Sequence, residues 1–111
     1  MSDPIEALKA DLRSFAKERD WDGYHTPKNL AMALSVEASE LAEIFQWLTT
    51  EQSQALPPEK LQHAREEIAD VLLYLVRLSD KLGVDVLAAA KDKIKKNAKK
   101  YPADPAKSRL W

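Results

Sequence analysis

Two stretches of sequence decide the fold, VEASELAEIFQW at residues 36–47 and REEIADVLLYLV at residues 65–76. Each contains two carboxylates three residues apart among aliphatic side chains, Glu37 with Glu40 and Glu67 with Asp70. Residues at this spacing lie on one face of a helix, and an ionised carboxylate among aliphatic groups is costly unless its charge is compensated. Two such pairs on two apolar helices predict four oxygen ligands converging on a hard divalent cation.

The flanking sequence predicts further helices with recognisable ends. Helix starts are marked by capping residues followed by proline or an apolar repeat, and one helix end is marked by a glycine. These signals predict long helices over about 4–18, 27–47, 58–82 and 86–100, with a short helical turn within 49–58. No segment shows strand-like alternation. We therefore predict a single all-α domain over residues 1–111, a four-helix bundle that ends in an extended tail at 102–111.

Composition narrows the functional classes. The 111 residues include 18 acidic and 17 basic side chains, a net charge of −1, and no cysteine. Bulk charge therefore gives no indication of nucleic acid or a membrane surface as a partner, and thiolate metal sites and disulfides are excluded. No apolar run reaches the roughly 18 residues of a membrane span, and the N-terminus has no hydrophobic signal region. We expect a soluble, cytoplasmic protein.

Aromatic and basic residues extend the two acidic faces. Trp47 follows Glu37 and Glu40 at helical steps, and Tyr74 follows Asp70 by four residues. The loop before the second long helix adds Trp21, Tyr24 and His25, and Lys93, Asn97 and Lys100 share one side of the last helix. A metal site beneath aromatic rings suits a ligand with a phosphate end and a flat base, and lysines could meet the phosphates that the metal does not hold.

The sequence resembles a known family, the all-α nucleoside triphosphate pyrophosphohydrolases of the MazG-like superfamily. The likeness is greatest to the small dCTP pyrophosphatase branch of that superfamily. The E-x-x-E and E-x-x-D signatures stand at residues 37–40 and 67–70, and the likeness continues through RDWDGYHTPKNL, ELAEIFQW, DVLLYLV and KIKKNAKKYP, over roughly residues 8–102. One E-x-x-E motif is weak because helices are rich in glutamate. The ordered set of all five blocks is a strong signal.

The resemblance implies Mg²⁺-dependent hydrolysis of a (deoxy)nucleoside triphosphate to the monophosphate and pyrophosphate, with Mn²⁺ as a substitute metal. It implies a catalytic metal site formed by four carboxylates, Glu37, Glu40, Glu67 and Asp70. It implies substrate contacts from Trp21, His25, Trp47, Tyr74, Lys93 and Asn97. It also implies a homo-dimer or homo-tetramer, which agrees with the third helix being apolar almost all round.

Two other classes compete with this interpretation. A di-iron carboxylate bundle normally needs two Glu-x-x-His motifs, and neither His25 nor His63 follows a glutamate at that spacing. A non-catalytic helical partner for nucleotides or nucleic acids would explain the C-terminal lysines but would leave the acidic pairs without a purpose. For single residues, Trp47 and Tyr74 could be core aromatics, His25 could help to cap a helix, and the lysines could form a solvated face.

Overall fold

The computed structural model describes residues 3–103, which form five α-helices and one 3₁₀ turn. The elements are α1 (Pro4–Glu18), η1 (Asp22–Tyr24), α2 (Pro27–Phe45), α3 (Thr50–Ser53), α4 (Pro58–Leu82) and α5 (Val86–Lys100). The all-α prediction is confirmed. The predicted tail falls largely on residues 104–111, which lie outside the described residues. No helix within residues 3–103 has the length and apolar character that crossing a membrane requires.

Local side-chain chemistry sets the helix ends. The side chains of Asp3, Thr26 and Asp85 each accept a backbone hydrogen bond in the first turn of α1, α2 and α5. Gly83 ends α4 with a φ of 68°, the left-handed conformation that glycine adopts without steric cost. The second long helix ends at Phe45, two residues before the predicted Trp47, because a capping box at Thr49 and Gln52 opens α3 immediately afterwards.

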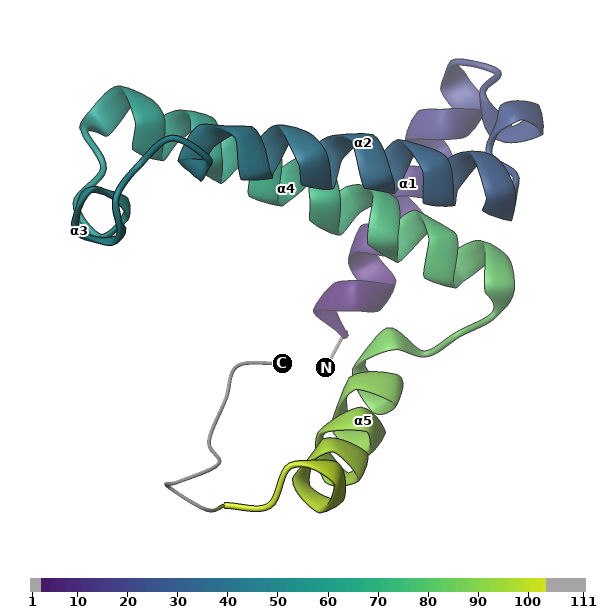
Figure 1. The fold of residues 1–111 in the computed structure, drawn as a ribbon. Coiled ribbons are helices and arrows are strands. Elements are labelled where there is room, and N and C mark those ends of the chain that lie inside the picture. Colours follow the sequence, from purple (N-terminus) through teal and green to yellow (C-terminus); the bar gives the residue numbers. More distant parts are fainter. Residues whose placement is uncertain (1–2, 104–111) are drawn as a thin grey trace.

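Helices α2 and α4 form the main packing unit. They run antiparallel along each other, while α1 crosses α4, and α5 points away from these three helices (Figure 1). Few side chains are fully enclosed: Leu30 on α2 and Val76 on α4 are the largest. The chain therefore has four long helices, as predicted, but within the described residues close packing between them is limited to α2 on α4 and α1 on α4.

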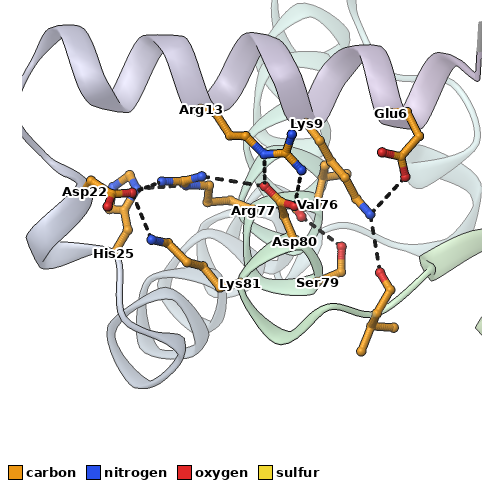
Figure 2. Close-up of polar contacts among 11 residues, drawn as sticks. Glu6, Lys9, Arg13, Asp22, His25, Val76, Arg77, Ser79, Asp80 and Lys81 are labelled. Carbon is orange, nitrogen blue, oxygen red and sulfur yellow. Dashed lines mark hydrogen bonds and ion pairs between the residues drawn. The ribbon is translucent and has the colours of Figure 1, made fainter.

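Ion pairs attach α1 to the C-terminal end of α4. The Arg13 guanidinium donates to both carboxylate oxygens of Asp80, at 2.7 and 2.6 Å, and holds the pKa of that carboxyl below its usual value. The buried Lys9 ammonium donates to Glu6 and to the Val84 carbonyl oxygen (Figure 2). These contacts fix the position of α1, whose inner face forms one wall of the cavity described next.

Candidate active site

Three of the four predicted ligands meet between α2 and α4. One carboxylate oxygen each from Glu37, Glu67 and Asp70 lies within 4.8 Å of the others. The antiparallel packing of α2 against α4 brings the two acidic segments opposite each other, and the three-residue spacing keeps Glu67 and Asp70 on the same face of α4. All three residues are partly buried. The predicted convergence of carboxylates from two helices is therefore present in the fold.

The carboxylate cluster, Glu37, Glu67 and Asp70, holds acidic groups that raise the cost of ionising one another. Burial first, then the proximity of Glu67, Glu40 and Asp70, raises the pKa of Glu37 to about 7. One oxygen each of Glu37 and Glu67 is buried and has no hydrogen-bond partner among the described residues. Buried oxygen atoms of this kind are costly when unpaired. A group of carboxylate oxygens, two of them buried without a hydrogen-bond partner, is suited to bind a hard divalent cation such as Mg²⁺.

The raised pKa of Glu37 predicts a pH dependence in the metal-free protein. Its folded-state pKa of about 7 lies above the ordinary glutamate pKa of 4.5, so the unfolded chain releases this proton more readily than the folded one. We expect the stability of the protein in EDTA to fall as pH rises from 4.5 to 7 and then to level off with respect to this group. Melting temperatures of wild type and Glu37→Gln across this range test the assignment: parallel curves would remove Glu37 as the source.

Glu40 lies beside the cluster. Its side chain is exposed, it does not belong to the three-oxygen group, and its charge contributes to the raised pKa of Glu37. Glu40 and Glu67 line an open hollow of about 440 Å³, together with Lys60 and His63 from the first turns of α4. The Nε2 atom of His63 lies 3.5 Å from a Glu67 oxygen. The hollow offers room for charged ligand groups on one side of the cluster.

An aromatic cavity lies on the other side of the cluster. It has a volume of about 240 Å³ and is lined by Leu12, Phe15, Trp21, His25, Asp70, Leu73, Tyr74 and Arg77. Phe15 packs edge-on against Trp21 with a centroid separation of 5.6 Å, and Trp21 lies 6.2 Å from the His25 ring. Asp70 belongs to both the cluster and the cavity wall, so the cavity meets the cluster at this residue.

The structure brings together some predicted substrate residues and not others. Trp21, His25 and Tyr74 line the aromatic cavity. Trp47 lies between α2 and α3, and 86% of its surface is exposed. Lys93 and Asn97 lie on α5, which points away from α2 and α4 (Figure 1). Within the described part of one chain, these last three residues line none of the hollows at the site.

Sequence reasoning missed Phe15 and Arg77. Phe15 comes from α1, and its approach to Trp21 depends on how α1 crosses α4, which no local pattern reveals. Arg77 did leave a signal: it stands three residues after Tyr74 and seven after Asp70, and therefore on the same face of α4. An arginine on a face that also carries a cluster acid and a cavity aromatic is a candidate site residue.

Comparison with known proteins then fixes the family. A model described as the MazG-like family matches residues 32–109, which is most of the chain. The chain belongs to the MazG-like family. The matched residues include both acidic segments of this MazG-like chain. Trp21 and His25 lie before the matched residues, although both line the cavity.

Individual relatives extend the likeness of the MazG-like chain. It is 44% identical over 100 residues to dCTP pyrophosphatase 1 of Mus musculus, covering 88% of this chain and 59% of the relative. It is 44% identical over 106 residues to dCTP pyrophosphatase 1 of Homo sapiens, covering 94% of this chain and 62% of the relative. The chain thus spans about three fifths of the length of these curated relatives. A crystal structure described as a pyrophosphatase from Archaeoglobus fulgidus superposes with a TM-score of 0.80 at 42% identity, covering 92% of this chain and 95% of that one.

Proposed function

We propose that this MazG-like chain is a metal-dependent nucleoside triphosphate pyrophosphohydrolase, which cleaves a (deoxy)nucleoside triphosphate to the monophosphate and pyrophosphate. The observation that carries the proposal is the carboxylate cluster, with two orphaned oxygens, at the mouth of an aromatic cavity. The relatives, described as dCTP pyrophosphatases and a pyrophosphatase, support the same reaction. We favour a dCTP-like or modified pyrimidine nucleotide as substrate, and a role in clearing the cytoplasmic nucleotide pool.

The roles of the residues follow from their positions. Glu37, Glu67 and Asp70 would hold the cation, with Glu40 as a further ligand from the edge of the cluster. Bound Mg²⁺ would supply charge neutralisation for the phosphates and activation of water. A carboxylate of the cluster would accept the proton of the attacking water. We propose that the nucleobase occupies the aromatic cavity, that the phosphates pass over the cluster, and that Lys93 and Asn97 contribute if α5 or a second chain reaches the phosphates.

Pyrophosphate release from a panel of deoxy- and ribonucleoside triphosphates, with Mg²⁺ or with EDTA, tests the proposal. We expect release that requires the metal and is fastest with a pyrimidine deoxynucleotide. Mn²⁺ should restore part of the activity in place of Mg²⁺. Nucleotide binding without any hydrolysis would instead support the non-catalytic class.

Replacing Trp21 with alanine is expected to weaken nucleotide binding. A base that stacks on an aromatic ring gains about 1–3 kcal/mol, and Trp21 is the indole that lines the cavity. Titration of the nucleotide monitored by calorimetry measures the loss, and an unchanged Kd would place the base elsewhere.

Trp47 stays a predicted member of the pocket, and its exposed ring is available to a ligand or a second chain. An unaltered Kd for Trp47→Ala would remove it from the pocket.

We also propose that the chain assembles into a homo-dimer or homo-tetramer. Large apolar side chains are more than half exposed on both main helices: Met32 at 63% and Val36 at 55% on α2, and Ile68 at 56% on α4. Exposed apolar surface in a soluble chain commonly marks an interface. Light scattering after size exclusion should give a multiple of 12.5 kDa, and Ile68→Glu should reduce it. A monomeric mass for the wild type at micromolar concentration would contradict the assembly.

A further inference from the structure

A buried arginine forms part of the wall of the aromatic cavity. Arg77 is 5% exposed, and its guanidinium contacts residues from the loop and from its own helix (Figure 2). It donates at 2.6 Å to Asp22 and at 3.3 Å from Nε to Nδ1 of His25, and it lies 3.7 Å from Asp80. Arg77 therefore connects α4 to the loop that carries the cavity residues Trp21 and His25.

The contact with Arg77 determines where the His25 imidazole carries its proton. A guanidinium has only donors and stays protonated in proteins, so Nδ1 of His25 must be the acceptor. Burial, then the charges of Arg77 and Lys81, lowers the pKa of His25, against a smaller opposing effect of Asp22. The contact with Arg77 and the lowered pKa both favour a neutral imidazole whose single proton is on Nε2.

The Nε2 group of His25 is available to a ligand. His25 lines the aromatic cavity with Trp21 and Tyr74, and among residues 3–103 no group accepts a hydrogen bond from its Nε2. We propose that Arg77 is a positioning residue that holds His25 in the Nε2–H form, so that His25 offers one fixed hydrogen-bond donor to the nucleobase. The proposal rests on the proposed function for the base, but the tautomer itself does not depend on activity.

A fixed donor gives the cavity a defined preference. A donor pairs with an acceptor on the base edge, either a carbonyl oxygen or an unprotonated ring nitrogen. The other tautomer would present a lone pair at Nε2 and would instead pair with an amino group. A polar group that the ligand leaves unpaired in such a site costs affinity. Arg77 would thus decide, through the His25 tautomer, which type of base edge the cavity accepts.

The tautomer can be measured directly by NMR on protein labelled with ¹⁵N-histidine. The chain has two histidines, and His63, on the far side of the cluster, serves as an internal comparison. In the ligand-free wild type we expect His25 to show a protonated Nε2 and an unprotonated Nδ1. In Arg77→Met the two forms should mix, while Asp22 keeps Lys81 and Asp80 keeps Arg13 as partners. A protonated Nδ1 in the wild type, or a spectrum unchanged in Arg77→Met, would overturn the proposal.

Two substitutions of His25 separate recognition from support. In His25→Gln the side-chain amide can place a donor near the position of Nε2, whereas in His25→Asn the amide oxygen can face Arg77 but leaves the cavity without that donor. We expect KM for dCTP to stay within a few-fold in His25→Gln and to rise about 10-fold or more in His25→Asn, with kcat little changed in both. Equal KM values, or the reverse order, would overturn the donor role.

Arg13→Ala is the matched control for these measurements. Arg13 belongs to the same set of ion pairs through Asp80 but does not line the aromatic cavity. We expect a lower Tm, with an unchanged KM and an unchanged His25 tautomer. A shift of either would show that the whole ion-pair network, and not Arg77, sets the state of His25. If wild type hydrolyses no nucleotide, the proposed function fails while the NMR result still decides the tautomer.

Discussion

Glu67→Gln is expected to reduce nucleotide hydrolysis by at least about 100-fold while leaving the helical circular dichroism unchanged. The glutamine keeps the size of the side chain but removes the negative charge. Glu67 is a member of the carboxylate cluster, and one of its oxygens is buried without a hydrogen-bond partner, so its charge has no structural counterpart within the described residues other than the nearby His63. Steady-state pyrophosphate release measures the effect.

Glu66→Gln provides the matched control for this substitution. Glu66 precedes Glu67 on the same helix, is exposed, stands outside the three-oxygen group and lines neither hollow at the site. Its replacement should change kcat by less than about two-fold, as is usual for a surface residue. Near-normal turnover in Glu67→Gln, or an equal loss in Glu66→Gln, would contradict the role of the cluster.

Millimolar Mg²⁺ is expected to stabilise the protein against heat. A ligand that binds only the folded state adds RT ln(1 + [L]/Kd), about 2.7 kcal/mol at 100 times Kd, which raises the Tm of a domain of this size by roughly 10 °C. The effect should be large here because the cation would also relieve repulsion within the cluster.

The Glu37→Gln variant shows whether the stabilisation comes from the cluster. In EDTA and above pH 7 it should melt at a higher temperature than wild type, because it lacks the carboxylate whose pKa is raised to about 7. With Mg²⁺ it should gain much less than wild type. Differential scanning fluorimetry of wild type and Glu37→Gln, each in EDTA and in Mg²⁺, measures both effects. A wild-type Tm that is the same in EDTA and Mg²⁺ would argue against a metal site.

The sequence predicted the features that depend on local chemistry. Asp3, Thr26 and Asp85 mark helix starts because their side chains accept backbone hydrogen bonds, and Gly83 marks a helix end because it adopts a positive φ. The convergence of the two acidic segments was also predictable. Carboxylates on the apolar faces of two helices are tolerated only if they share a partner.

Features that depend on the packing of distant elements were not predictable in this way. Glu40 and Asp70 hold equivalent places in their motifs, yet Asp70 joins the cluster and Glu40 lies beside it, because the rotation of each helix about its axis is set by the whole interface. The path of α1 decides that Phe15 faces Trp21. The caps of α5 are local, but no local pattern in the sequence predicts the direction of this helix.

The isotope position in the products tests the central claim, that the carboxylate cluster and the aromatic cavity together hydrolyse the bond between the α- and β-phosphates. The reaction is run on dCTP in ¹⁸O-water with Mg²⁺, and the products are analysed by mass spectrometry. A base in the cavity lined by Asp70 places the α-phosphate nearest to the cluster, so attack at the α-phosphorus should give dCMP that carries ¹⁸O and unlabelled pyrophosphate. Label found only in pyrophosphate, or formation of dCDP and orthophosphate, would contradict this account.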